Sequence, residues 1–297
     1  MDIGAGKDLQ VLKNINTVLF DCDGVLWDAN GKAITGAVET LSLLRQMGKR
    51  VFFVTNNSSK TRQQYAERCK ALGFQATEDE IVCTAWLLAA YFKELLNFQG
   101  KVYVIGGAAV ASEFTAKAID FIGPGEETYG ATEMGYSTYL SMELDPDVNA
   151  VAVAFDPYIN YVKVVKAVSY LHKTGCVFVA SNMDSCFPTL GEIKLPGTGS
   201  IVNFVSTGAG REPVVVGKPN ILAKNILEAA HGKFDDERTM MVGDRLNTDI
   251  AFGNHCGFKT MAVLTGVATL DDISAAKGSA EEPTYYTSSL MNLMELW

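Results

Sequence analysis

The chain has no excess of basic residues, no closely paired cysteines and no long apolar run. Its 297 residues include 25 Lys and Arg against 34 Asp and Glu, so the formal net charge is -9 at pH 7. Nucleic acids and anionic membranes attract basic patches, and this balance therefore argues against both as the main partner. An anionic small molecule is still compatible if a metal ion and a lysine make its site locally positive.

The cysteines form no CxxC pair, which predicts reduced thiols rather than a disulfide framework or a zinc site. No run reaches the roughly 18 apolar residues of a membrane span. The first ten residues, MDIGAGKDLQ, also lack the apolar core of a signal peptide. We therefore expect a cytoplasmic enzyme or binding protein. The cysteines stand at positions 22, 69, 83, 176, 186 and 256.

Two carboxylates follow the first apolar run of the chain. Residues 17–20 predict a buried strand, and Asp21 and Asp23 come directly after it. Residues two apart in an extended chain project to the same side, and Gly24 allows a sharp turn behind them. Two neighbouring carboxylates repel each other unless they are protonated or bridged by a cation, which predicts a Mg²⁺ site. The alternative is an ordinary polar turn after a core strand.

Strand and helix patterns then alternate, which predicts an α/β fold with a parallel sheet. The strand expected at 50–55 ends in Thr55, Asn56 and Asn57, at the same sheet edge as Asp21. This polar run suits the start of a helix, and amides at a helix start also bind phosphate. Strands are expected at 17–20, 50–55, 101–105, 148–155, 176–180, 214–216, 239–242, 259–264 and near 285, and helices at 36–48, 59–73, 85–96, 108–119, 161–174, 220–231, from about 249, and at 290–297.

A second series of strands and helices begins near residue 100 and predicts an inserted α/β block. Its last strand leads into a polar loop, which we expect to select the substrate, although connecting loops are polar by default. The glycines at 106 and 107 do not match a dinucleotide fingerprint. The small residues 206–210 predict a linker out of the block. The loop residues of interest are Asn182, Asp184 and Phe187, and the expected division is 1–96 for the first part of the core, 97–210 for the insert and 211–297 for the second part of the core.

Later strand ends add Lys218, Asp244 and Asp249. Together with the earlier residues they suit phosphoryl transfer. Carboxylates hold a cation that reduces repulsion of a phosphate dianion, while lysine and short polar donors hold its oxygens. One carboxylate can attack phosphorus and a second can act as general acid and base. Taken singly, each of these residues has a simpler explanation. Lys218 could belong to a solvated turn, Asp244 could be an ordinary turn residue, and Asp249 could cap a helix.

Four segments in this order resemble the haloacid dehalogenase superfamily of phosphatases. They are Asp-x-Asp-Gly at 21–24, a motif centred on Thr55, the lone Lys218, and Gly-Asp-x-x-x-x-Asp at 243–249. The resemblance implies a Rossmann-like parallel-sheet core with an inserted α/β cap of the C2 type, as in p-nitrophenyl, phosphoglycolate and pyridoxal phosphate phosphatases. It implies a Mg²⁺-dependent phosphomonoester hydrolase that forms an aspartyl phosphate.

The resemblance also implies a role for each matching residue. Asp21 would be the nucleophile and Asp23 the general acid and base. Mg²⁺ would be bound by the carboxylates of Asp21 and Asp244 and the backbone carbonyl of Asp23. Asn247 stands where related sequences often have an acidic residue, and the metal set is intact without it. Thr55, Asn56, Asn57 and Lys218 would bind the phosphoryl group, with Asp249 orienting the lysine or a metal-bound water.

The cap loop implies a small substrate. Residues 182–184 resemble the phosphoglycolate branch, whereas the pyridoxal branch has a histidine about where Phe187 stands. We therefore expect 2-phosphoglycolate or glycerol 3-phosphate, with pyridoxal 5'-phosphate and broad p-nitrophenyl phosphatase activity as alternatives. Members of the family commonly dimerise through the cap, so a homodimer is expected.

Other classes of function are less compatible with the sequence. A receiver-type phosphoaspartate switch is much shorter and needs no second aspartate. A catalytically silent binding module would have no need for the full set of polar residues, and a roofed site admits small substrates more readily than phosphoproteins. Cys22, between the two acids, raises the hypothesis of oxidant sensitivity, with a buried inert thiol as the alternative. The three histidines, at 172, 231 and 255, are assigned no catalytic part.

Overall fold

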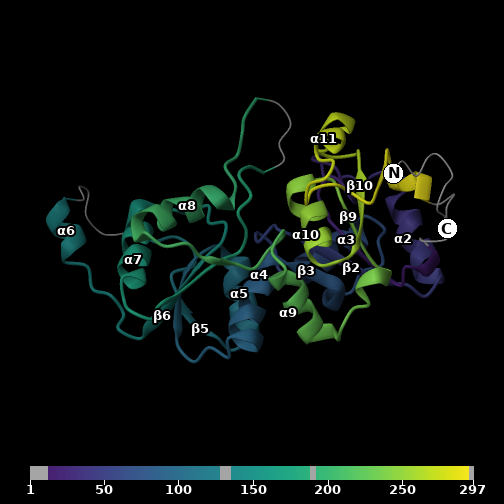
Figure 1. Cartoon of the computed structure of the whole chain (residues 1–297). Coiled ribbons are helices and arrows are strands. Elements are labelled where there is room, and N and C mark those ends of the chain that lie inside the picture. Colours follow the sequence, from purple (N-terminus) through teal and green to yellow (C-terminus); the bar gives the residue numbers. More distant parts are fainter. Residues whose placement is uncertain (1–12, 128–134, 188–191, 294–297) are drawn as a thin grey trace.

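The computed structural model describes residues 13–127, 135–187 and 192–293, and these form two lobes, each built on a sheet (Figure 1). All strand pairs in both sheets are parallel, which confirms the predicted α/β class.

The six-stranded sheet has the order β11-β10-β9-β1-β2-β3 and comprises β1 (Thr17–Phe20), β2 (Arg50–Thr55), β3 (Ile81–Cys83), β9 (Thr239–Gly243), β10 (Lys259–Val263) and β11 (Tyr285–Thr287). The five-stranded sheet has the order β5-β4-β6-β7-β8 and comprises β4 (Lys101–Ile105), β5 (Asp120–Ile122), β6 (Val148–Val153), β7 (Val177–Ala180) and β8 (Val214–Val215).

Strand β1 lies near the middle of the six-stranded sheet and positions the functional edge. It pairs with β2 and β9, so that Phe20 lies opposite Phe53 in one and Val242 in the other. All four residues of β1 are buried, as expected for a strand covered on both faces. Because the strands run in parallel, the residues that follow β1, β2 and β9 emerge at one edge of the sheet.

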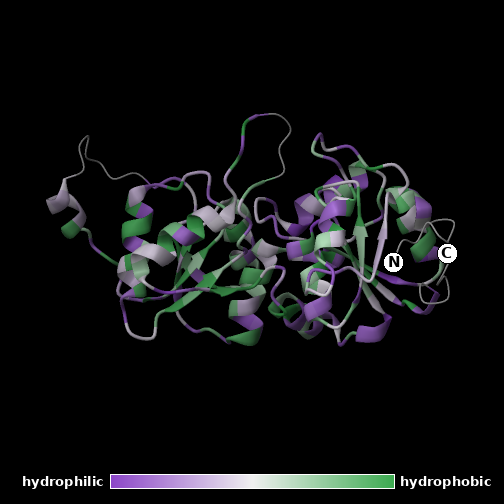
Figure 2. Ribbon diagram, turned by 45° about the horizontal axis from the view of Figure 1, so that its top comes forward, coloured by the Kyte–Doolittle hydropathy of each residue, from purple (hydrophilic) through white to green (hydrophobic). Residues whose placement is uncertain are grey.

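Helices cover both sheets, and apolar residues concentrate in the strands and the helix faces against them (Figure 2). In the first lobe these are α2 (Ala37–Gln46), α3 (Arg62–Ala71), α9 (Leu222–His231), α10 (Ala251–His255) and α11 (Leu270–Ala275). In the second they are α5 (Ala108–Ala116), α7 (Tyr161–Leu171) and α8 (Thr198–Ala209), whereas α6 (Tyr136–Leu140) has no buried residue and projects from the outer end of this lobe (Figure 1). Short 3₁₀ turns span Glu78–Glu80, Asp236–Arg238 and Leu290–Leu293.

Helix α4 (Thr84–Ala90) joins the two lobes. All seven of its residues are buried, and it packs against α5 of the second lobe and α9 of the first. It then continues as a π-helical turn, Tyr91–Leu95. Residues of both lobes, such as Phe53 and Val104, belong to one continuous apolar cluster. The lobes are therefore held together by apolar packing as well as by the chain.

The predicted linker at residues 206–210 is wrong. Residues 206–209 form the last turn of α8, and Gly210 ends that helix in a left-handed conformation with φ 62°. Small polar residues resemble a linker in sequence, but Val202 and Val205 bury one face of the helix. A Cβ on Gly208 would lie 2.8 Å from a Val168 methyl group, so small residues let α8 approach α7 closely.

Assigning residues 211–297 to the core predicts that β8 joins the six-stranded sheet, and this prediction is also wrong. Val215 pairs with Ala180 of β7 at the edge of the five-stranded sheet. A two-residue apolar strand carries no sequence signal for its partner, so only long-range pairing decides which sheet it joins.

The remaining differences concern short elements. Strands β3 and β5 and helix α6 were not predicted, since three to five residues give no periodicity to detect. The helix expected from Asp249 starts earlier, as a π-helical turn (Leu246–Ile250) that leads into α10. The terminal helix predicted at 290–297 is a 3₁₀ turn over Leu290–Leu293, and its last four residues lie outside the described ranges. No described helix is long and apolar enough to cross a membrane.

Candidate active site

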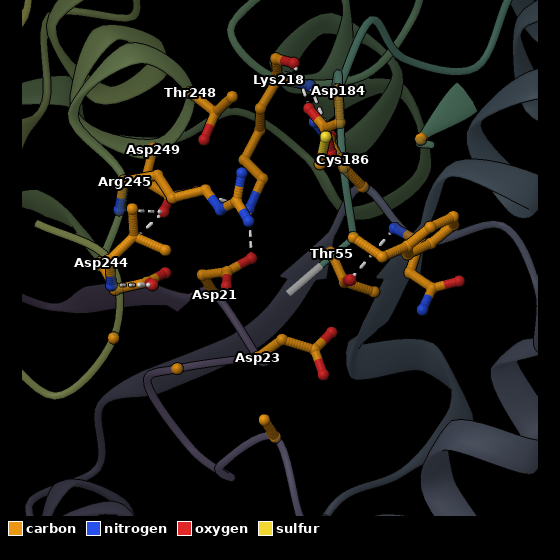
Figure 3. A pocket seen from close by; sticks show the side chains of 18 of the residues that line it. Asp21, Asp23, Thr55, Asp184, Cys186, Lys218, Asp244, Arg245, Thr248 and Asp249 are labelled. Carbon is orange, nitrogen blue, oxygen red and sulfur yellow. Dashed lines mark hydrogen bonds and ion pairs between the residues drawn. The ribbon is translucent and has the colours of Figure 1, made fainter. Parts of the chain in front are cut away.

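A cavity of about 820 Å³ lies where the strand ends of the first sheet face the loop after β7 (Figure 3). Every residue that the sequence singled out for the site lines it. These are Asp21, Asp23, Thr55, Asn56, Asn57, Asn182, Asp184, Phe187, Lys218, Asp244 and Asp249.

Lys218 is held between two carboxylates. Its Nζ lies 2.5 Å from Asp21 Oδ1 and 2.7 Å from Asp249 Oδ1, and it also donates to the Val54 carbonyl oxygen at 2.8 Å. Only 2% of the side chain is exposed. Burial alone would lower the pKa of Lys218, but the charges of Asp21 and Asp249 outweigh it and raise that pKa. The lysine is therefore a permanent positive charge at the centre of the site.

Asp21 sits in a setting that disfavours its charged form. Burial raises its pKa well above the ordinary value, Asp249 and Asp244 raise it further, and Lys218 opposes them. A carboxylate in this position needs additional positive charge to become a nucleophile.

Asp244 offers an oxygen for a cation. Its Oδ2 accepts a hydrogen bond from the Val267 amide at 2.9 Å, whereas its buried Oδ1 has no partner among the described residues. Burial and the neighbouring Asp249 raise the pKa of Asp244 to about 7. Carboxylate oxygens of Asp21, Asp244 and Asp249 lie within 4.8 Å of one another. An unpaired buried carboxylate oxygen in an all-oxygen cluster fits a hard divalent cation such as Mg²⁺.

Asp249 has its oxygens largely committed to protein groups. Oδ2 accepts from the backbone amides of Asp244, at 3.2 Å, and Arg245, at 3.0 Å, while Oδ1 faces Lys218. It is thus placed to orient the lysine and the Asp244 segment. That supporting role, like the predicted metal contact by the Asp23 carbonyl, remains a prediction.

Two glycines leave room for the Asp244 carboxylate. A Cβ on Gly266 would lie 1.9 Å from its Oδ2, and one on Gly24 would lie 2.5 Å from the same atom. Gly24 also has φ +87°, a region that favours glycine. The turn at Gly24 was predicted, but the contribution of Gly266 was missed because its proximity to Asp244 depends on how β9 and β10 pair.

Asp23 is held by an aromatic neighbour that the sequence analysis also missed. The indole Nε1 of Trp27 donates to Asp23 Oδ1 at 2.8 Å. Trp27 is fully buried and stacks on Tyr65, with ring centroids 6.4 Å apart. This contact orients one carboxylate oxygen and leaves Asp23 at the cavity wall.

Asn56 joins the first lobe to the loop of the second. Its Nδ2 donates to Asp184 Oδ1 and to the Lys218 carbonyl oxygen, both at 3.0 Å, and its Oδ1 accepts from the Lys218 amide at 3.0 Å. The side chain therefore organises Lys218 and the loop. Next to it, Thr55 Oγ1 accepts from the Asn57 amide at 3.1 Å. Phosphate binding by these residues remains a prediction.

The loop after β7 is anchored in the same way. Asn182 Nδ2 donates to the Asn56 carbonyl oxygen at 2.7 Å, and the Asp184 amide donates to Asn182 Oδ1 at 3.0 Å. Phe187 packs edge-on against Phe155, with centroids 4.8 Å apart. Asp184 and Phe187 thereby face the strand ends of the first sheet, as a substrate-selecting loop requires.

Other lining residues carried no sequence signal. They include the turn at residues 28–31, Arg68, Cys186, Leu195, Arg245, Thr248 and Val267. In contrast, Cys22 is buried, and burial together with Asp21 raises the pKa of its thiol, which favours the inert alternative. Among the described residues that line the cavity there is no histidine.

Comparisons with known proteins agree with this geometry. A family model for haloacid dehalogenase-like hydrolases matches residues 18–120, and a second, HAD-hydrolase-like model matches 215–293. Glycerol-3-phosphate phosphatase of Rattus norvegicus is 39% identical, over 98% of this chain and 94% of that protein. Phosphoglycolate phosphatase 2 of Arabidopsis thaliana is 40% identical, over 95% and 93%.

A solved structure shares the architecture. The glycerol phosphate phosphatase of Mycobacterium tuberculosis in complex with magnesium superposes with a TM-score of 0.76 and 28% identity, over 95% of this chain and 78% of that one. Sequence, fold and the meeting of the four motif segments at one sheet edge thus place the chain in the family of haloacid dehalogenase-like hydrolases.

Proposed function

We propose that the chain is a Mg²⁺-dependent phosphatase of small phosphomonoesters, with 2-phosphoglycolate and glycerol 3-phosphate as the leading substrates. The observation that carries this proposal is the meeting of Asp21, Lys218 and the half-satisfied Asp244 at one sheet edge. The names of the most similar relatives support the substrate class. The cavity, about 820 Å³ in volume and overhung by the Asp184 loop, suits a small molecule better than a folded protein.

The metal site is assigned to carboxylates of the first lobe. Asp21 and Asp244 would hold Mg²⁺ through carboxylate oxygens and Asp23 through its backbone carbonyl, and the magnesium complex of the related phosphatase supports the choice of ion. The bound ion would screen the repulsion between Asp21 and a phosphate dianion.

Asp21 and Asp23 would carry the chemistry. A carboxylate oxygen of Asp21 attacks phosphorus, and the bond from phosphorus to the ester oxygen breaks while Asp23 gives a proton to the leaving alcohol. Asp23 then takes a proton from water, whose oxygen attacks the aspartyl phosphate and releases phosphate and the Asp21 carboxylate. Lys218 and Thr55 hold phosphoryl oxygens during both steps.

Steady-state kinetics test this proposal. Phosphate release from 2-phosphoglycolate, glycerol 3-phosphate and pyridoxal 5'-phosphate is measured side by side, with Mg²⁺ and with EDTA. We expect turnover that needs Mg²⁺ and falls to background in Asp21→Asn, whose folding is checked by circular dichroism. A long-lived phosphoprotein without turnover would indicate a signalling switch, and no hydrolysis on a broad phosphomonoester panel would indicate a silent module.

We propose a two-part organisation in which the second lobe is a cap inserted into the first. Residues from about 97 form this cap, and the pairing of β8 with β7 favours an end near residue 215 rather than 210. The six free thiols suit a reducing compartment, which supports a cytoplasmic location.

We also propose that the cap mediates a homodimer. Its outer end exposes Tyr136 by 89% and Leu140 by 83%, near the ring pair of Tyr139 and Tyr161. Large exposed apolar side chains gathered in this way are typical of interfaces. Sedimentation velocity on the wild type and on Leu140→Glu tests this proposal, because the variant should be monomeric. A wild-type monomer at micromolar concentration would contradict it.

A further inference from the structure

Arg245 lines the cavity without an ionic partner. Its backbone amide is anchored on Asp249 Oδ2 at 3.0 Å. Within the described ranges, no carboxylate oxygen lies within 4.0 Å of its guanidinium, and the group donates no hydrogen bond. Figure 3 shows the side chain reaching from the Asp244 side of the cavity toward its centre.

The position of Arg245 differs from that of Lys218. Burial raises the pKa of Asp184, and the charge of Arg245 opposes this effect. The guanidinium, which lines the same cavity, is therefore within electrostatic reach of the cap loop. Lys218, in contrast, is committed to Asp21 and Asp249 at the reaction centre. A group bound by Arg245 would lie beside the phosphoryl site, where the leaving alcohol extends.

The chemistry of the Arg245 guanidinium narrows the choice of ligand. A half-buried guanidinium gains most from a bidentate oxyanion, and its planar donors match a carboxylate. A neutral polyol would instead have its hydroxyl groups next to Asp184, which accepts hydrogen bonds. The same cavity thus contains one partner for an acid and another for an alcohol.

We propose that Arg245 binds a carboxylate on the leaving group, so that the site prefers phosphorylated hydroxy acids over phosphorylated polyols. This specificity rests on the proposed phosphatase function. Arg245 is a specificity residue, and Asp21 and Asp23 still perform the two chemical steps.

The test compares two substrates in matched variants. In Arg245→Gln, KM for 2-phosphoglycolate should rise at least tenfold relative to KM for glycerol 3-phosphate, and Arg245→Lys should restore part of the difference. The control is Arg68→Gln, since Arg68 also lines the cavity but lies over the Trp27 ring, at 4.5 Å from its centroid. The control should leave the ratio of the two KM values as in the wild type.

Two results would overturn the inference. One is an equal rise of KM for both substrates in Arg245→Gln, and the other is the same change of ratio in Arg68→Gln. Calorimetric binding of 2-phosphoglycolate to Asp21→Asn, with and without Arg245→Gln, separates binding from turnover. If the wild type hydrolyses neither substrate nor any other phosphomonoester, the proposed function itself fails.

Discussion

The carboxylate of Asp244 accepts one hydrogen bond at Oδ2, from Val267, and none at Oδ1 from the residues described. Gly266 and Gly24 lie so close to Oδ2 that a Cβ on either would clash with it, and only glycine leaves room for the carboxylate in this position. At the scale of single residues, Asp244 thus has one oxygen fixed by a hydrogen bond and one oxygen without a hydrogen-bond partner. The positive charge of the neighbouring Lys218 is already paired with Asp21 and Asp249. The free oxygen of Asp244 therefore needs a different cation.

Gly266→Ala tests how closely Asp244 must be positioned. The added Cβ would lie 1.9 Å from Oδ2, so the carboxylate must move and lose its contact with Val267. We expect kcat to fall about 10²-fold, as for an ångström-scale displacement of a catalytic group. The Mg²⁺ concentration for half-maximal rate should also rise. Gly107→Ala is the control, since its nearest neighbour is 3.9 Å away, and equal losses in both variants would contradict the explanation.

Asp184→Asn tests whether the buried carboxylate of Asp184 destabilises the folded protein at neutral pH. Burial raises the pKa of Asp184, so the folded protein holds this proton to a higher pH than the unfolded chain, whose Asp pKa is about 3.9. Stability from this group is therefore present at low pH and lost as pH rises. The variant should melt at a higher temperature than the wild type at pH 7.5, and the gain should vanish below about pH 4.

Asp28→Asn should change the melting temperature in the opposite direction. Backbone amides of Lys32 and Asn30 donate to Asp28, and these bonds lower its pKa. Its stabilising effect is present above the unfolded pKa and lost as pH falls. This variant should therefore melt lower than the wild type at pH 7.5. A shift of the same sign in both variants would contradict the assignment.

At the scale of elements, helix α7 carries an ion pair with no exposed surface. Lys163 Nζ lies 2.5 Å from Asp156 Oδ2 and also donates to the Gly125 carbonyl oxygen, while the Tyr158 amide donates to Asp156 Oδ1 at 2.8 Å. This network ties the end of β6 to α7 in the cap. Loss of one partner would leave a buried charge without compensation.

Lys163→Met should destabilise the protein by about 3–5 kcal/mol, the cost of breaking a buried pair from one side. The matched control is Lys166→Met on the same helix, where Lys166 and its partner Glu127 are about 20% exposed, and it should cost under about 1 kcal/mol. Urea unfolding followed by circular dichroism measures both. Similar small effects would show that the cap does not depend on the buried pair.

At the scale of the whole molecule, the active site is completed only where the two lobes meet. Asn56 links Lys218 to Asp184, and α4 fills the space behind with buried apolar side chains. The three carboxylates that could hold a metal ion, however, all come from the first lobe. The proposed function therefore assigns metal binding to the first lobe and substrate selection to the loop of the second.

Mg²⁺ should raise the melting temperature of the wild type, because a ligand bound to the folded state alone stabilises it by about 2.7 kcal/mol at 100 times its Kd. Asp244→Asn should lose most of this shift, since it removes the carboxylate with the free oxygen. Asp28→Asn should retain it, because Asp28 lines the cavity but is engaged in its own turn. Differential scanning fluorimetry over a Mg²⁺ titration measures this shift in melting temperature. A full shift in both variants would contradict the assignment of Asp244 as a metal ligand.

Local signals in the sequence are sufficient to predict the parallel α/β fold and the main residues of the candidate site. Apolar runs that end in Asp21, Thr55 and Asp244 are local signals, and the parallel order of strands then brings their ends to one edge. Tertiary structure alone decided the rest. Gly266 approaches the Asp244 carboxylate, β8 joins the second sheet, and the small residues before Gly210 form a helix against α7, because each depends on contacts between segments far apart in the chain.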